Sequence, residues 1–511
     1  AAALRRGPCR RRGGREPPWA RLPHQPWWGA AGRLRLREMH TQLQDLARRH
    51  GPVFKVNLLL GMTTYFVVDH EGIRTVLEGS KQRGLEEQPK GKLYANLRAD
   101  RIPRGAPRER GYSLFSLPTG EEWRWRRKAL RNHFAMSRLR GCTPTIVAKV
   151  DTLTRVLAGA AREGRAVDMQ DWCLRLTLDV ISVAMLGGYD LGALEGSWEG
   201  DALRCSLPIM LELAVLRAWQ PWRRLNPWCK DNALRQHHRN VFRRVLSHIL
   251  AEYEAKGPEH REKDDSMLGT LLKMRNPATG RGLHRDDVLL QLGGMYIAGH
   301  DTTGNTLAWT IHLLAEHPDA QEALQREVDE AFGGEDAPAP EELNAKLSGL
   351  KFLHGVLQEA MRLFPVAAGG PSREAREDLV VSGFCIPKGS DVGIPLYAAF
   401  RDESQGWERP EAFLPSRWLQ EDVPGSRGFV PFSVGKRSCI GQSLAILEAK
   451  AVLALLALRF SFKTAEPPRP QMGLTLGSAN GVRVTVARRT SHGRFSPPSG
   501  QRKPQEGERP R

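Results

Sequence analysis

Residues 432–441 have the sequence Phe432-Ser433-Val434-Gly435-Lys436-Arg437-Ser438-Cys439-Ile440-Gly441, a loop with two glycines directly before an apolar helix pattern. A thiolate needs its charge compensated, and loop N–H groups, Arg437 and the positive N-terminal end of the next helix can all do so. Gly435 and Gly441 have no Cβ, so a large flat group can approach the backbone there. Phe432 can shield the sulfur from water. The stretch therefore indicates that Cys439 is presented to a metal.

Two other roles for Cys439 are a buried structural thiol, which is common for a free cysteine, and a zinc ligand. Zinc is disfavoured because no second Cys or His lies near Cys439 at metal-ligand spacing. One thiolate without partners suits an iron held in a macrocycle better. The pattern Phe-x-x-Gly-x-Arg-x-Cys-x-Gly resembles the haem-binding loop of the cytochrome P450 family, in which the cysteine is the proximal iron ligand.

This resemblance implies a mainly α fold with a small β-rich region and a long buried central helix over haem b. It places one haem-thiolate domain at residues 38–488, between a basic leader or disordered segment at 1–37 and a disordered basic tail at 489–511. In addition, the haem-binding residues implied are Trp123, Arg127, Arg373, Phe432, Gly435, Arg437, Cys439 and Gly441, with Cys439 as the metal ligand.

The local patterns predict helices at 38–50, 286–316, 319–332, 341–363 and 443–458. Strands are expected at 52–56 and 64–68, which form a hairpin, and at 460–462, 474–476 and 482–487, with Ala479-Asn480-Gly481 as a hairpin turn. Residues 120–257 are mostly helical, with breaks near Gly187–Gly200 and Pro221–Pro227. Residues 82–117 form a long irregular segment, which the resemblance places over the substrate pocket.

The predicted helix over 286–316 is apolar nearly all round, as expected of a buried helix. It contains Ala298-Gly299-His300-Asp301-Thr302-Thr303, and buried acids and hydroxyls are costly without partners, which favours a functional role. Gly299 weakens the helix and favours a bulge. The motif resembles the family's oxygen-activation signature, which implies that Thr302 hydrogen-bonds bound dioxygen and that Asp301 relays protons. A structural alternative is a kink held by side-chain bonds to the backbone; His300 is expected to be a packing or surface residue.

Two further sets of charges gain meaning from the resemblance. Glu359 and Arg362 share a helix face at i, i+3, and with Arg417 they match the family's structural ion-pair triad. Haem propionates are carboxylates that need cations, and Trp123-x-x-x-Arg127 and Arg373 match propionate-binding positions. A propionate contact is not expected at Phe400-Arg401-Asp402, where the family often has His-Arg.

The formal net charge of +19 lies largely at the ends: residues 1–37 carry +9 and residues 489–511 carry +4, which leaves +6 for the middle. No nucleic-acid motif is present, so we expect no nucleic-acid partner. Modest positive charge suits an acidic redox partner or is plain solvated surface. Seven cysteines without paired spacing indicate a reducing compartment.

Residues 1–37 contain ten Arg and one Glu but no apolar run that could span a bilayer. Three interpretations remain: a leader for an organelle such as a plastid or mitochondrion, a lost upstream leader or membrane anchor, and a disordered tail. Membrane-surface contact is expected near Pro17-Pro18 and Trp27-Trp28, because Trp and Arg favour that interface.

The function predicted is a haem-thiolate monooxygenase that uses dioxygen to hydroxylate a lipophilic small molecule. Because the 511 residues contain no dinucleotide fingerprint, electrons should come from a separate ferredoxin or flavin reductase. Alternatives are an isomerase or peroxygenase without a reductase, and a haem sensor. The resemblance implies pocket walls from 100–118, 205–225, 290–303, 366–372 and 479–481.

Overall fold

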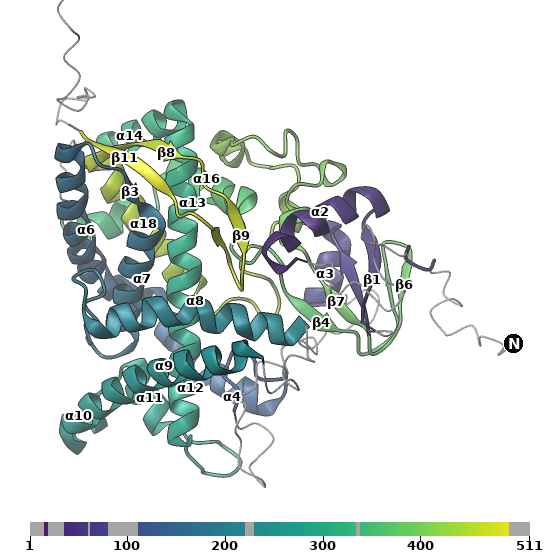
Figure 1. Cartoon of the computed structure of the whole chain (residues 1–511), viewed down its shortest axis with the longest axis horizontal. Helices are drawn as coiled ribbons and strands as arrows, with labels where there is room; N and C mark the ends of the chain where they lie inside the picture. Colours follow the sequence, from purple (N-terminus) through teal and green to yellow (C-terminus); the bar gives the residue numbers. More distant parts are fainter. Residues whose placement is uncertain are drawn as a thin grey trace, which may run out of the picture.

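A computed structural model describes residues 15–18, 35–59, 62–79, 111–219, 229–333 and 338–489. Most of the basic leader, the segment 82–110, the predicted break at Pro221–Pro227 and nearly all of the tail lie outside these residues. Within them the fold is mainly α with a small β-rich region, which confirms the predicted class (Figure 1).

In the larger, helical part, the helices share one hydrophobic core around a central helix. Its helices are α4 (Glu121–Arg131), α5 (Met136–Leu139), α6 (Thr143–Glu163), α7 (Met169–Met185), α8 (Trp198–Trp219), α9 (Lys230–Ala255), α10 (Gly257–Lys263), α11 (Met267–Lys273), α12 (Arg285–Tyr296), α13 (Thr302–Glu316), α14 (Pro318–Phe332), α15 (Pro340–Lys346), α16 (Lys351–Leu363) and α18 (Gln442–Arg459). Local signals set their ends: Asp168 caps α7 by accepting from the Gln170 N–H at 3.0 Å, and Gly164 ends α6 at φ 63°.

The predicted helix over 286–316 is present but not uniform. A π-helical segment, η7 (Ile297–Asp301), joins α12 to α13. The bulge expected near Gly299 is thus confirmed. Helix α13 then packs against α7, α16, α18 and β8 (Phe460–Glu466), and runs through the middle of the helical part (Figure 1). This burial explains why its sequence lacks a polar face.

The prediction of one helix over 341–363 is wrong, because the chain forms α15 and α16 with a break between them. Near the break the Gly349 N–H donates to the Lys346 carbonyl at 2.9 Å, which closes a turn instead of continuing the helix. Glycine weakens a helix interior, and here it interrupts the apolar pattern.

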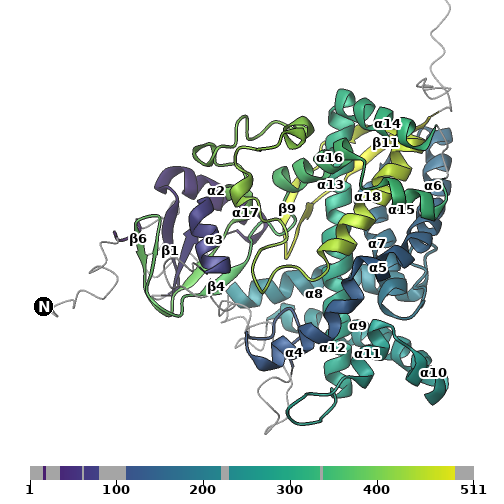
Figure 2. The ribbon, with the colours of Figure 1, turned by 180° about the vertical axis from the view of Figure 1, so that it is seen from behind.

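The smaller part combines β-strands with α2 (Met39–His50) and α3 (His70–Glu78), and lies beside the helical part (Figure 2). Its four-stranded sheet has the order β1-β2-β7-β4, formed by β1 (Val53–Leu59), β2 (Met62–Val67), β7 (Asp391–Gly393) and β4 (Ser372–Glu374). The expected hairpin of β1 and β2 is antiparallel, with Phe54 opposite Phe66. The parallel pairing of β2 with β7 joins segments more than 300 residues apart in the chain, and β4 then pairs with the other edge of β7.

The remaining strands form three small sheets: β5 (Leu379–Val381) with β6 (Phe384–Ile386), β9 (Pro470–Met472) with β10 (Leu476–Ser478), and β3 (Val167–Asp168) with β11 (Arg483–Arg488) and β8. Residues 479–481 therefore connect two different sheets, and the predicted hairpin turn is wrong. Gly481 has φ 76° and approaches the Asp168 carboxylate closely enough that a Cβ would lie 2.2 Å from its Oδ2. The turn is thus shaped by Asp168 and not by strand pairing.

Two observations bear on the expectations about compartment. Among the described helices, none combines the length and apolarity needed to cross a membrane. Cys385 is disulfide-bonded, whereas Cys142, Cys173, Cys205, Cys229 and Cys439 are free. The expectation that no cysteine is paired is therefore wrong at Cys385.

Candidate functional site

A cavity of about 1400 Å³ lies between the central helix and the loop that carries Cys439. Its walls come from α12, η7 and the start of α13 on one side, and from the Cys439 loop and the start of α18 on the other. Segment 111–116, α4, α8, α9, β2, β4 and residues 472–475 also contribute to the walls. The predicted wall at 479–481 is wrong, since the preceding loop, Met472–Thr475, takes that place.

The Cys439 loop is closed by its own backbone. The Cys439 N–H donates to the Phe432 carbonyl at 2.8 Å, and the Ser438 N–H donates to that of Gly435 at 3.1 Å. Gly435 has φ 78° and Ser433 has φ 57°, a region that costs a non-glycine residue energy. Gly435 is thus needed for the backbone turn. At Gly441, a Cβ would lie 4.0 Å from the Cys439 sulfur, which is ordinary contact.

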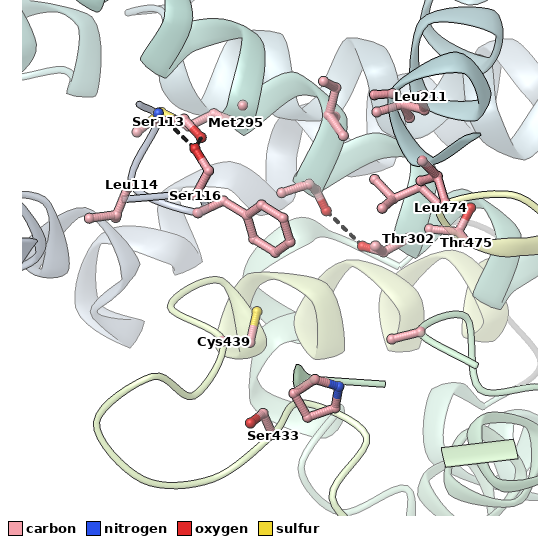
Figure 3. Close-up of a pocket in the computed structure, with 18 of the residues that line it drawn as sticks. Ser113, Leu114, Ser116, Leu211, Met295, Thr302, Ser433, Cys439, Leu474 and Thr475 are labelled. Carbon is pink, nitrogen blue, oxygen red and sulfur yellow. Dashed lines mark hydrogen bonds between the residues drawn. The ribbon is translucent and has the colours of Figure 1, made fainter. Parts of the chain in front are cut away.

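The sulfur of Cys439 faces the cavity, on the side opposite to Thr302 (Figure 3). The protein around the sulfur disfavours its charged form and thereby raises the pKa of the thiol. Backbone N–H groups of Gly441 and Gln442 and the charge of Arg127 act in the opposite direction. The cation that acts on the thiolate is therefore Arg127, whereas the sequence suggested Arg437.

Arg437 is engaged on the cavity wall instead. Its Nε donates to Oγ1 of Thr119 at 3.0 Å, its Nη2 donates to the Leu117 carbonyl, and its guanidinium lies 4.1 Å from the centroid of the Trp123 ring. Arg127 lies over the same ring at 5.5 Å and donates from Nη2 to the Ser438 carbonyl at 2.9 Å. The predicted residues Trp123, Arg127 and Arg437 are thus brought together next to Cys439.

Arg373 reaches the cavity from a different element, β4. It is 1% exposed, and its Nη1 donates to the Ser372 carbonyl at 3.1 Å. Arg401 does not line the cavity; its Nε donates to Oε2 of Glu411 at 3.1 Å, and its guanidinium lies 3.7 Å from the Tyr397 ring centroid. The structure therefore places all three predicted cations, Arg127, Arg373 and Arg437, on the cavity wall. Arg401, where no propionate contact was expected, lies away from the cavity.

The predicted distal pair separates into one residue on the cavity and one behind it. Thr302 lines the cavity, and its hydroxyl donates to the Ala298 carbonyl at 2.7 Å, across the π-helical segment (Figure 3). Asp301 is 8% exposed and does not line the cavity. Its carboxylate accepts from Oγ1 of Thr475 at 2.5 Å and from Nδ2 of Asn305 at 3.3 Å. The bond from Thr302 to the backbone is the kind that the structural alternative foresaw.

His300 faces away from the cavity. It is buried, its Nδ1 lies 2.7 Å from the Tyr296 carbonyl oxygen, and burial lowers its pKa. Gly299 permits this packing, because a Cβ there would lie 2.6 Å from the Ile181 side chain. The expectation that His300 serves packing agrees with this position.

In the structure, Glu359 contacts both arginines of the predicted ion-pair triad. Oε1 of Glu359 lies 2.8 Å from Nη2 of Arg362 and 3.0 Å from Nε of Arg417. Glu359 and Arg362 have side chains that are 0% exposed, and Arg362 also donates to the Pro410 carbonyl at 2.6 Å. A charge buried this deeply requires partners, which the triad supplies.

Several site residues were not found by sequence reasoning. Thr475 carries no motif, and only the fold brings it to Asp301. Trp418 donates from Nε1 to Oε2 of Glu359 at 2.8 Å, as a fourth member of the triad's network. Glu448, in α18, is 1% exposed and lines the cavity, and its Oε1 has no hydrogen-bond partner among the described residues. The sequence feature that could have pointed to Glu448 is an acidic residue within a largely apolar helix pattern.

The sequence of this chain was compared with known protein families and with individual proteins. The profile of the family described as Cytochrome P450 matches residues 20–482. Cytochrome P450 734A5 of Oryza sativa subsp. japonica is 31% identical over 373 residues, 69% of this chain and 66% of that protein. A cytokinin hydroxylase of Arabidopsis thaliana is 30% identical over 376 residues, 72% of this chain and 70% of that protein. Cytochrome P450 4V2 of Homo sapiens is 27% identical over 395 residues, 73% of each chain.

Proposed function

Because this chain belongs to the cytochrome P450 family of haem monooxygenases, we propose that Cys439 is the proximal ligand of haem b and that the enzyme hydroxylates a lipophilic molecule. The observation that carries the proposal is the arrangement of the cavity, which the sulfur of Cys439 faces from one side and Thr302 lines from the other.

The residues around the cavity fit a flat macrocycle that carries two carboxylates. Arg127, Arg373 and Arg437 supply cations and N–H donors for the carboxylates, and Trp123 supports two of these guanidinium groups with its ring. Gly441 leaves the backbone open beside the sulfur, and Phe432 covers the loop side. When bound, the haem supplies the iron at which dioxygen is reduced, and the protein supplies position and protons.

The role we assign to the distal residues is control of protons. Thr302 presents a hydroxyl at the cavity wall, and Asp301 is a carboxylate with a connection to the interior through hydrogen bonds. This pair supports a monooxygenase over an isomerase or peroxygenase, which has less need of delivered protons. Electrons are proposed to come from a separate ferredoxin or flavin reductase.

The substrate is proposed to be lipophilic because much of the cavity wall is apolar. The wall opposite Cys439 includes Leu211, Met295 and Leu474 (Figure 3), and Ala367 lies near β4. The relative from Arabidopsis thaliana is named a hydroxylase, which supports hydroxylation as the reaction. Terpenoid, fatty-acid and sterol panels, screened for ligand-induced spin-state shifts, would narrow the class.

The test is the absorption spectrum of the reduced, carbon-monoxide-bound protein. We expect the red-shifted band of a thiolate-ligated haem in wild type and its loss in Cys439→Ala. Cys142→Ala, which removes a free cysteine outside the cavity wall, is the matched control and should keep the band. Haem-loaded wild type without this band, or a Cys439→Ala variant that retains it, would overturn the assignment. Oxygen consumption that depends on a reductase would exclude the sensor and isomerase alternatives.

A further inference from the structure

Among the described residues, the hydroxyl of Thr475 connects the Asp301 carboxylate to the cavity. Thr475 lies in the loop between β9 and β10 and lines the cavity (Figure 3). Asp301 does not line the cavity. The Thr475 hydroxyl donates to Oδ2 of Asp301 at 2.5 Å, which is shorter than the 3.3 Å bond from Nδ2 of Asn305 to Oδ1 of the same carboxylate. The position of Thr475 Oγ1 is thus between the acid and the cavity.

The loop that carries Thr475 is held on both sides. The Gly473 N–H donates to the Thr475 carbonyl at 2.8 Å, which closes a tight turn. The next residue, Leu476, donates its N–H to the Val366 carbonyl at 2.8 Å and accepts from Nε1 of Trp309 at 2.9 Å. Since Trp309 belongs to α13, the same helix that follows Asp301 anchors the loop. The two ends of the Thr475–Asp301 bond are therefore fixed relative to each other.

The other polar groups near Asp301 are turned elsewhere. Nδ2 of Asn305 donates to the Asp301 backbone carbonyl at 2.7 Å and reaches the carboxylate only at 3.3 Å. The Thr302 hydroxyl donates to the Ala298 carbonyl, and Nδ1 of His300 lies against the Tyr296 carbonyl. Among the described residues, Thr475 is the group that both contacts the carboxylate side chain closely and faces the cavity.

We propose that Thr475 is the positioning residue that passes protons from Asp301 into the cavity, an inference that rests on the proposed monooxygenase function. A hydroxyl can accept and donate at once. When Asp301 is protonated, it gives its proton to Oγ1 of Thr475 while the hydroxyl proton of Thr475 moves to a water molecule in the cavity. Thr475 ends neutral, Asp301 ends as a carboxylate, and solvent returns one proton to Asp301. No electrons are transferred in this step.

The experiment compares Thr475→Val with Thr475→Ser, because valine keeps the shape and removes the hydroxyl whereas serine keeps the hydroxyl. Each haem-loaded protein is supplied with electrons by a flavin reductase, and the hydrogen peroxide released per dioxygen consumed is measured. Without delivered protons more reduced oxygen leaves as peroxide, so Thr475→Val should raise this share at least roughly threefold, given that acid–base groups contribute about 10²–10⁴-fold to proton transfers. Thr475→Ser should restore the wild-type share.

Thr485→Val is the matched control, since Thr485 lies in β11 outside the cavity wall and its hydroxyl donates to the Lys463 carbonyl at 3.3 Å, away from Asp301. The ratio of oxygen-consumption rates in H₂O and D₂O should change in Thr475→Val and not in Thr485→Val. A purely structural role of Thr475 would not move this ratio. Peroxide release in Thr475→Val that equals the control, or falls below wild type, would overturn the proposal.

A second readout needs no turnover. Thr475→Val, Asp301→Asn and the double variant are compared by their midpoints of thermal unfolding, and the two substitutions should be non-additive because they share one bond. If the shift of the midpoint in the double variant equals the sum of the shifts in the two single variants, the two side chains are not coupled and the contact is overturned. If Thr475→Val does not fold, Thr475→Ala serves in both tests. The carbon-monoxide spectrum of every variant is recorded first, so a failure of the proposed function appears there, separately from a failure of the Thr475 proposal.

Discussion

The Glu359 carboxylate accepts a hydrogen bond from Nε of Arg417 at 3.0 Å, across 58 residues of chain. Because Glu359 lies in α16 and Arg417 in the 3-10 helix η9 (Pro415–Leu419), this bond ties the helix to the segment that precedes the Cys439 loop. The Leu414 N–H, at 3.1 Å, donates to the same oxygen. The position of the loop thus depends on one buried acid.

Glu359→Gln should lower the free energy of unfolding by about 3–5 kcal/mol, because it leaves the buried Arg362 without its counter-charge. Glu342→Gln is the matched control: Glu342 pairs with Lys346 at i, i+4 on α15, and partly exposed pairs contribute about 0–1 kcal/mol. Guanidinium chloride unfolding measures both. Equal losses in the two variants would contradict the structural role of the triad.

Arg437→Gln should speed haem loss about tenfold, since it removes a cation and a charge-assisted donor worth about 1.5–3 kcal/mol. Arg437→Lys should rescue little, because an ammonium group cannot reproduce the contacts with Thr119, Leu117 and the Trp123 ring. Transfer of haem to a competing apoprotein, followed by absorbance, gives the rate. Lys436→Gln, one residue away and exposed, is the control, and a loss rate for Arg437→Gln no faster than for this control would count against the assignment.

Gly299→Ala should destabilise the protein by about 1–3 kcal/mol, because the added methyl group would lie 2.6 Å from Ile181 and overpack the contact between η7 and α7. Gly159→Ala is the opposite case in α6: a Cβ there meets nothing within 4 Å, so the change should stabilise by about 0.5–1 kcal/mol. Urea unfolding of both variants checks the difference in sign. A stable Gly299→Ala variant would show that the central helix can move away from α7.

Glu448→Gln should make stability less dependent on pH. Burial raises the pKa of the Glu448 carboxyl well above its ordinary value, so the folded protein keeps a proton that the unfolded chain releases. The stabilisation is fully present below the ordinary glutamate pKa and is lost as pH rises toward the raised one, at up to about 1.4 kcal/mol per pH unit.

The measurement for Glu448 is the free energy of unfolding from pH 4 to 8. The Gln variant should show a smaller decline with rising pH than wild type, and it should be the more stable of the two at the upper end. Glu341→Gln, an exposed position at the start of α15, should leave the wild-type slope unchanged. If Glu448→Gln also leaves the slope unchanged, the carboxyl is ionised in the folded state.

Local patterns predicted the elements of this fold well where one signal dominated. The apolar run over 286–316, the helix predicted over 319–332 and the strand hairpin predicted at 52–56 and 64–68 correspond to α12 with α13, to α14, and to β1 with β2. Local patterns failed where tertiary contacts decide. The break before α16 and the turn at Gly481 depend on neighbours that no local window contains, and in the second case on the carboxylate of Asp168.

The site shows the same division. Motif spacing picked out Cys439, Thr302 and Arg437, and the fold brings all three to one cavity. Spacing could not show that Arg127 is the cation that acts on the thiol, because its effect depends on how α4 lies against the loop. Nor could it find Thr475, whose contact with Asp301 spans 174 residues.

The π-helical segment at Ile297–Asp301 also sets the angular phase of the central helix. A π turn holds one residue more than an α turn, and each residue of an α-helix turns the chain by about 100°. If the same residues instead formed an uninterrupted α-helix, everything after this segment would be rotated by about that angle relative to α12, so Thr302 would turn away from the cavity wall. The extra residue thus works as an offset that lets one helix present leucines along its first half and a hydroxyl at its midpoint to the same space.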